Sequence, residues 1–140
     1  MIRESLDEPL PLDGSPRRSV LIVDDDDCTA EVLSLRLGQQ GFDTLTATSG
    51  ARALAVARLE RPSVVLLDLR LPDIDGLAVC QELADDPDTA EIPVIMVSGM
   101  ERPDVIRSCR AAGCQFYVRK PYDPNALLIL IQQAIDEAQA

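Results

Sequence analysis

Short apolar runs alternate with longer segments of helical periodicity along most of this chain. Three of these runs, at 20–23, 64–67 and 94–97, are apolar at consecutive positions, and each is followed by a polar residue. Runs that are apolar at both even and odd positions are typical of parallel strands buried on both faces. Two weaker runs, at 43–47 and 115–119, complete a set of five predicted strands.

Helices are predicted in the intervals between and after these strands. Their expected ranges are 28–40, 50–60, 75–85, 102–112 and 124–138. Pro103 and Pro124 suit the first turn of a helix, and Asp123 is a suitable N-cap. Gly41 and Gly113 fall directly after expected helix ends, where glycine is common.

Five strands that alternate with five helices predict an α/β fold. Consecutive strands joined by helices become parallel through right-handed crossovers, with helices on both faces of the sheet. We therefore predict a (βα)5 doubly wound parallel sheet in a three-layer sandwich, formed by residues 19–140. Residues 1–18 contain three prolines and no sustained periodicity, which predicts a flexible N-terminal tail.

The composition of the 140 residues argues against several classes of function. The formal net charge is −11 and histidine is absent, so neither nucleic acid nor an anionic membrane is an expected partner. No stretch reaches the length of a membrane span, and the N-terminus lacks the apolar region of an export signal. We therefore expect a cytoplasmic protein. The four cysteines lack paired metal-binding spacing and are expected to stay reduced.

Five polar residues stand at or directly after the ends of four predicted strands: Asp24, Asp25, Asp68, Ser98 and Lys120. In open α/β sheets, ligands bind outside the carboxyl ends of the strands, so these side chains are expected to meet at one edge. Three crowded carboxylates repel one another unless a cation lies between them, and Mg²⁺ prefers such hard oxygen ligands. A bound Mg²⁺ would let a phosphoryl anion approach a carboxylate, while Lys120 and Ser98 can contact its oxygens.

Four segments of the sequence resemble the receiver domain of two-component response regulators. They are residues 23–26 (VDDD), 67–76 (LDLRLPDIDG), 92–99 (IPVIMVSG) and 117–121 (YVRKP). The resemblance extends from about Ser19 to the C-terminus and implies a flavodoxin-like strand order of 2-1-3-4-5. No further domain follows the last predicted helix, so a stand-alone regulator similar to those of chemotaxis is expected.

The resemblance also implies roles for the acidic residues. Asp68 would be the phosphoacceptor. Asp25, Asp68 and the main-chain carbonyl of Arg70 would bind Mg²⁺ directly, and Asp24 would act through a metal-bound water, with Mn²⁺ able to replace Mg²⁺.

The same resemblance implies a switch near the last two strands. Ser98 would follow the phosphoryl group, Lys120 would bind it, and Tyr117 would repack in concert. The Lys120–Pro121 peptide is expected to be cis. Gly99 stands where the family often has alanine, and either residue leaves room for the phosphoryl group. An ordinary half-buried position in a strand is the alternative for Tyr117.

Two further features point to regulation and to partners. Arg70 and Met100 flank the expected site and are predicted to tune the lifetime of the phosphate by controlling access of water. In the last helix, residues 126–131 are apolar on all sides, and Ile129 and Leu130 lie away from the face expected to pack on the sheet. We predict a partner surface there, formed with the fourth helix; scattered surface apolar residues are the alternative.

The predicted function is Mg²⁺-dependent acceptance of a phosphoryl group on Asp68. The donor would be a sensor histidine kinase or a histidine phosphotransfer protein, and the last helix–strand–helix face would bind a downstream protein or a second copy. Beyond self-phosphorylation and slow dephosphorylation, no enzymatic activity is expected. A phosphorylation-independent binding module remains an alternative. An aspartyl-phosphate phosphatase is a second alternative, although such enzymes need a second aspartate where Arg70 stands.

Overall fold

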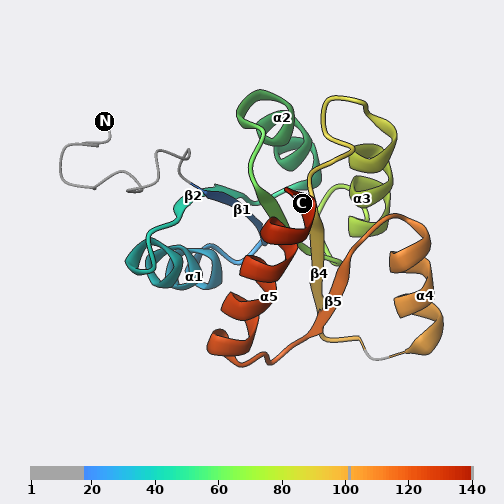
Figure 1. Cartoon of the computed structure of the whole chain (residues 1–140). Helices are drawn as coiled ribbons and strands as arrows, with labels where there is room; N and C mark the ends of the chain where they lie inside the picture. The colour runs from blue at the N-terminus through green and yellow to red at the C-terminus, as the bar shows by residue number, and fades with distance from the viewer. Residues whose placement is uncertain (1–17, 101, 140) are drawn as a thin grey trace.

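The computed structural model describes residues 18–100 and 102–139, which alternate strand and helix throughout (Figure 1). The strands are β1 (Ser19–Val23), β2 (Asp43–Ala47), β3 (Val64–Asp68), β4 (Val94–Ser98) and β5 (Phe116–Arg119). The helices are α1 (Asp27–Gln39), α2 (Gly50–Glu60), α3 (Gly76–Asp85), α4 (Pro103–Ala111) and α5 (Pro124–Ala138). The predicted ranges agree with these bounds to within one residue at each end. Apart from Arg18, the predicted tail of residues 1–18 lies outside the described residues.

The five strands form one parallel sheet in the order β2-β1-β3-β4-β5, which confirms the predicted topology. Val23, the last residue of β1, pairs with Ala47 of β2 and with Leu67 of β3. Asp68 at the end of β3 in turn pairs with Val97 of β4. This register brings the carboxyl ends of the three central strands side by side.

Two hydrophobic cores, one on each face of the sheet, explain why each central strand contains four consecutive apolar residues. In β1, Leu21 and Val23 pack in the core that contains residues of α2, α3 and α4. Val20 and Ile22 pack in the other core, with α1 and α5. Strands β3 and β4 divide their residues between the two cores in the same alternating way. The result is the predicted three-layer sandwich, with α5 crossing one face of the sheet in Figure 1.

Helices begin at capping residues and end before glycines where the sequence predicts. Asp123 caps α5 by accepting a hydrogen bond from the Asn125 amide, and Pro124 occupies the first turn. Gly41 and Gly113 follow α1 and α4 with φ values of 92° and 109°, a left-handed region that glycine adopts without steric cost.

The cysteines of the fold are free thiols, and three of them are buried: Cys80, Cys109 and Cys114. Burial raises the pKa of Cys80 to about 12 and that of Cys114 to about 11. These thiols therefore stay protonated at neutral pH, as expected of small core residues. Across the part of the chain that the structure describes, no helix is both long and apolar enough to cross a membrane.

Candidate functional site

The carboxyl ends of the strands surround a polar pocket of about 370 Å³. Its lining residues are Asp25, Asp68, Arg70, Ser98, Gly99, Met100 and Lys120. Asp68 and Ser98 are the last residues of β3 and β4, and Lys120 follows β5 directly. Asp24 lies behind the pocket, in a smaller cavity that it shares with Asp68 and Lys120. The structure thus brings together all five residues that the sequence placed at strand ends.

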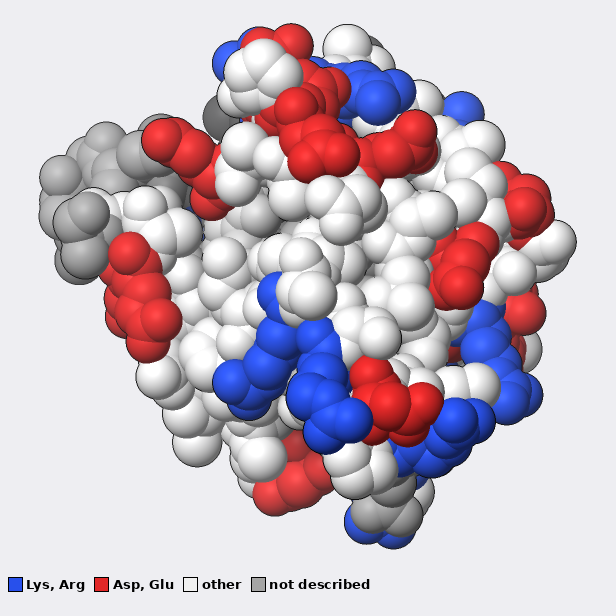
Figure 2. All heavy atoms as spheres, turned by 90° about the vertical axis from the view of Figure 1, so that its right-hand side faces the viewer, with Lys and Arg blue, Asp and Glu red and all other residues white. Residues whose placement is uncertain are grey.

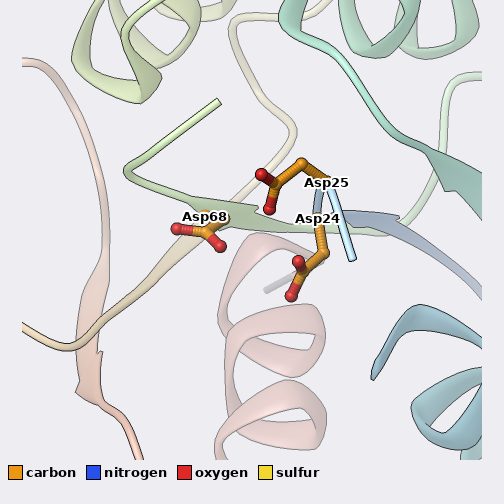
Figure 3. A group of neighbouring side chains, drawn as sticks. All are labelled: Asp24, Asp25 and Asp68. Carbon is orange, nitrogen blue, oxygen red and sulfur yellow. The ribbon is translucent and has the colours of Figure 1, made fainter. Parts of the chain in front are cut away.

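Three carboxylates, two in the lining of this pocket and one behind it, lie close together (Figure 3). Asp24, Asp25 and Asp68 each offer one oxygen, and these oxygens lie within 4.8 Å of one another. Asp24 and Asp68 are buried, whereas Asp25 is exposed at the rim. A cluster of hard oxygen donors that is open on one side fits an ion such as Mg²⁺, which keeps several waters as ligands.

Lys120 bridges the two buried carboxylates. Its Nζ atom lies 3.0 Å from Oδ2 of Asp68 and 3.3 Å from Oδ2 of Asp24. Burial by itself lowers the pKa of Lys120, but the hydrogen bond and charge of Asp68, followed by those of Asp24, outweigh it and raise the pKa above its usual value. Lys120 is also the only lysine of the chain, so the pocket contains the single ammonium side chain available.

The second oxygen of each buried carboxylate accepts a hydrogen bond from the backbone. Oδ1 of Asp24 accepts from the Asp26 amide at 2.9 Å, and Oδ1 of Asp68 accepts from the Arg70 amide at 3.0 Å. Each side chain is therefore held at both oxygens, by an amide on one side and by Lys120 on the other. This arrangement fixes the orientation of the carboxylates before any ligand binds.

The end of β4 and the residues directly after it are tied to the pocket by two hydrogen bonds. The Ser98 hydroxyl accepts a hydrogen bond from the Met100 amide at 3.1 Å, and the Lys120 amide donates to the Ser98 carbonyl at 2.8 Å. The Tyr117 hydroxyl donates to the Met100 carbonyl, so the half-buried ring contacts this segment from β5. The Lys120–Pro121 peptide is cis, as the resemblance implies.

Two glycines near the pocket differ in how much space surrounds the position of a Cβ atom. A Cβ atom on Gly76 would lie 2.6 Å from the Asp68 carbonyl oxygen and 2.7 Å from Cα of Leu69, which the backbone cannot accommodate. At Gly99, in contrast, a Cβ atom would meet nothing within 4 Å. Packing therefore requires glycine at position 76, whereas alanine would fit at position 99.

Sequence reasoning missed one contact close to the pocket. The carboxylate of Asp73, in the loop after β3, accepts hydrogen bonds from the Gly50 and Ala51 amides of α2. No sequence pattern predicts this contact, because the partners lie 22 and 23 positions apart.

The last helix presents its apolar residues as the periodicity predicts. Leu127, Ile131 and Ile135 are buried against the sheet. Ile129 points away from the core with 67% of its surface exposed, and Leu130 is half-buried at the edge of the core.

Comparisons with known proteins identify response regulators as relatives of this chain. The sequence-family model of the response regulator receiver domain matches residues 20–132. The DNA-binding response regulator MtrA of Mycolicibacterium smegmatis is 37% identical over 117 residues, which cover 83% of this chain and 50% of MtrA. The transcriptional regulator RpaA of Synechocystis sp. is 35% identical over 114 residues, covering 81% of this chain and 47% of RpaA. The chain thus spans about half the length of these two relatives.

Solved structures agree with this assignment. A CheY-like receiver domain from Methanospirillum hungatei JF-1 has a TM-score of 0.83 and 27% identity, over 88% of this chain and 97% of that chain. The chemotaxis protein CheY4 of Vibrio cholerae has a TM-score of 0.80 and 26% identity, over 84% and 98% of the two chains. Both the sequence match and the strand order lead to one conclusion: this chain belongs to the receiver domain family of two-component response regulators.

Proposed function

We propose that Asp68 accepts a phosphoryl group from a phosphohistidine of a sensor histidine kinase or a histidine phosphotransfer protein. The observation that carries this proposal is the position of Lys120, whose ammonium contacts both buried carboxylates of the pocket. A cation beside the acceptor can neutralise charge on the incoming phosphoryl oxygens. The family to which the chain belongs supports the same role.

In the proposed transfer step, one carboxylate oxygen of Asp68 attacks the phosphorus atom. The new O–P bond forms as the N–P bond of the donor breaks, and the electron pair of that bond returns to the donor imidazole. Phosphoryl transfer depends on positioning and charge neutralisation more than on covalent chemistry from the protein. The two hydrogen bonds that Asp68 accepts, from the Arg70 amide and from Lys120, position its carboxylate. Lys120 also supplies part of the positive charge that neutralises the phosphoryl group.

Mg²⁺ is the proposed cofactor, with Mn²⁺ able to replace it. Asp25, Asp68 and the main-chain carbonyl of Arg70 are the proposed direct ligands, and Asp24 would hold the ion through a water. The carboxylate cluster supports this assignment because its oxygens converge within 4.8 Å. When bound, the ion neutralises the carboxylates and the transferring phosphoryl group.

Ser98 and Tyr117 are proposed to transmit phosphorylation to the surface. The Ser98 hydroxyl would turn from the Met100 amide to a phosphoryl oxygen, and Gly99 leaves space for this movement. The loop between β4 and α4 would then shift. Because Tyr117 donates to the Met100 carbonyl, its ring would have to follow that shift.

Incubation of the chain with Mg²⁺ and acetyl phosphate tests the proposal. We expect the intact mass to rise by one phosphoryl group, and the adduct to disappear slowly after the acetyl phosphate is removed. An immediate, continuing release of phosphate from many substrates would instead indicate an aspartyl-phosphate phosphatase. The absence of any adduct would indicate a receiver-like module that binds partners without phosphorylation.

Arg70 and Met100 are proposed to set the lifetime of the phosphate. Both side chains line the pocket, Arg70 exposed and Met100 half-buried, so they can obstruct or admit an attacking water. We expect Arg70→Ala and Met100→Ala each to change the rate of phosphate loss by about 3-fold or more, a barrier change of about 0.7 kcal/mol. The decay of the adduct mass with time measures this rate. Parental rates in both variants would show that other residues control water access.

The face formed by α4, β5 and α5 is the proposed partner surface, for a downstream protein or for a second copy of the chain. It combines the exposed Ile129 with exposed arginines of α4, Arg107 and Arg110. Figure 2, which shows the side of the molecule where α4 lies, has most of its basic side chains in the lower half, with acidic side chains beside them and a larger acidic group at the top. This composition fits a partner with an apolar centre and acidic neighbours.

Ile129→Asp is expected to weaken self-association or target binding by about 10-fold or more, because it places a charge where apolar surface would be buried. Sedimentation velocity of the phosphorylated chain measures self-association, and affinity capture of the cognate target measures binding. Leu59→Asp is the matched control, since Leu59 is also an exposed aliphatic residue, 80% exposed against 67% for Ile129, but lies on α2. Equal self-association and equal target binding in Ile129→Asp and Leu59→Asp would show that Ile129 is not part of the partner surface.

A further inference from the structure

Asp73 connects two parts of the fold that are distant in sequence. Its Oδ1 atom accepts a hydrogen bond from the Gly50 amide at 2.8 Å, and its Oδ2 atom accepts from the Ala51 amide at 3.0 Å. These are the first two amides of α2, whereas Asp73 belongs to the loop that follows the acceptor strand β3. The hydrogen bonds, first that of Ala51 and then that of Gly50, lower the pKa of Asp73 below its usual value.

The other aspartate caps of the fold act locally. Asp26, Asp75 and Asp123 each accept from an amide two or three residues further along and cap the helix that they precede. The ordinary cap of α2 is Ser49, which accepts from the Arg52 amide at 3.2 Å. The two hydrogen bonds of Asp73 are therefore additional to the local cap, and they bridge α2 and the loop.

Packing around Gly50 shows that α2 and this loop lie in close contact. A Cβ atom on Gly50 would lie 3.0 Å from Cβ of Ile74 and 2.9 Å from Cγ2 of Val79. At its base the loop is closed by a hydrogen bond from the Gly76 amide to the Leu69 carbonyl at 2.9 Å. The loop is thus held at its base by its own backbone and farther out by α2.

Arg70 lies between these two attachments. Its amide donates to Oδ1 of Asp68, its side chain lines the pocket, and its carbonyl is a proposed ligand of Mg²⁺. Mg²⁺ requires near-ideal octahedral geometry, so a small displacement of one ligand lowers its affinity. Residues that orient ligands from outside the site commonly change metal affinity by about 10- to 100-fold when removed.

We propose that Asp73 is a positioning residue that uses the N-terminus of α2 to hold the Arg70 backbone in place for Mg²⁺ and for the phosphoryl group on Asp68. This role rests on the proposed function, because it concerns the same pocket. Asp73 itself lies outside the lining of that pocket and touches neither Asp25 nor Asp68 in the described contacts. Its removal is therefore expected to change the affinity for Mg²⁺ and the lifetime of the phosphoryl group, while Asp68 remains the phosphorylated residue.

The test compares Asp73→Ala with Ser49→Ala. Each variant removes a side chain that accepts amide hydrogen bonds at the start of α2, but only Asp73 connects α2 to the loop. Titration calorimetry with Mg²⁺ is expected to show affinity about 10-fold weaker for Asp73→Ala, and within 2-fold of the parental value for Ser49→Ala. Asp73→Asn keeps one acceptor oxygen, so its affinity for Mg²⁺ is expected to lie between those of Asp73→Ala and Ser49→Ala.

Thermal unfolding of each variant, followed by circular dichroism, sets a temperature at which all of them are folded, so loss of fold cannot imitate loss of affinity. Equal weakening by Asp73→Ala and Ser49→Ala would show that Asp73 acts only as a helix cap, and unchanged affinity in Asp73→Ala would equally overturn the positioning role. Absence of Mg²⁺ binding by the parental chain would overturn the proposed function and this role together.

Discussion

Asp68→Ala is expected to gain no phosphoryl group from acetyl phosphate and Mg²⁺ under conditions in which the parental chain gains one. Asp68 is the carboxylate in the lining of the pocket that Lys120 contacts at one oxygen and the Arg70 amide at the other. Asp24 is buried behind it, and Asp25 makes no hydrogen bond or ion pair with the ammonium among the described residues, so neither can take its place with the same charge neutralisation. Intact-mass spectrometry measures the outcome directly.

Asp27→Ala is the matched control, because Asp27 is an exposed aspartate in the first turn of α1, near the same rim. It is expected to be phosphorylated at the parental rate. An adduct that persists in Asp68→Ala would contradict the proposal and place the acceptor on another residue.

Mg²⁺ should also stabilise the parental fold more than it stabilises Asp68→Ala. A ligand at 100 times its dissociation constant adds about 2.7 kcal/mol to the free energy of unfolding. Asp68→Ala removes one of three clustered carboxylates, so most of this increment should be lost. Unfolding by denaturant, with Mg²⁺ or with EDTA, gives the comparison without any phosphodonor.

Lys120→Met is expected to slow phosphorylation of Asp68 by about 100-fold. The substitution keeps an unbranched side chain of similar length but removes the cation that contacts Asp68 and Asp24. Loss of one preorganised charged donor from a site of developing charge typically reduces rates by about 10²- to 10³-fold. The rate at which the adduct mass appears, at fixed Mg²⁺ and acetyl phosphate, measures the effect.

The defect of Lys120→Met should not depend on pH between about 6 and 9. The pKa of Lys120 is raised above its usual 10.5, so the contribution of its ion pairs is fully present below that value and disappears only as pH rises through the higher folded-state pKa. Arg52→Met, which removes an exposed cation on α2, serves as the control and should keep the parental rate. Parental rates in Lys120→Met would show that the ammonium has no part in the transfer.

The unfolding free energy of Lys120→Met should also fall when no divalent cation is present. Asp24 and Asp68 are buried, and without the ammonium their charges repel across a site of low solvent access. Because the Lys120 side chain is itself about one-third exposed, we expect a loss of only about 1 to 2 kcal/mol. Addition of Mg²⁺ should recover part of it, since the ion would neutralise the same carboxylates.

Much of the fold and of the candidate site could be predicted from the chain alone. Strands β1, β3 and β4 each contain four consecutive apolar residues because each face of the sheet meets its own core, and that pattern is visible in the sequence. The polar residues at the strand ends, from Asp24 to Lys120, could be assigned to one edge because parallel strands all end there. The Asp123 cap was predictable for a different reason: the amide that it accepts from is a neighbour in sequence.

The contacts that complete the site depend on tertiary structure. Lys120 reaches Asp24 across 96 positions, Tyr117 reaches Met100 across 17, and Asp73 reaches α2 across 22 and 23. Such pairs form only after the sheet and its helices have packed, so no local periodicity or spacing encodes them. The sequence by itself determined the layers, the strand ends and the residues that gather there. Only the tertiary structure decided which atoms those residues contact, because distances of about 3 Å depend on how all the elements pack together.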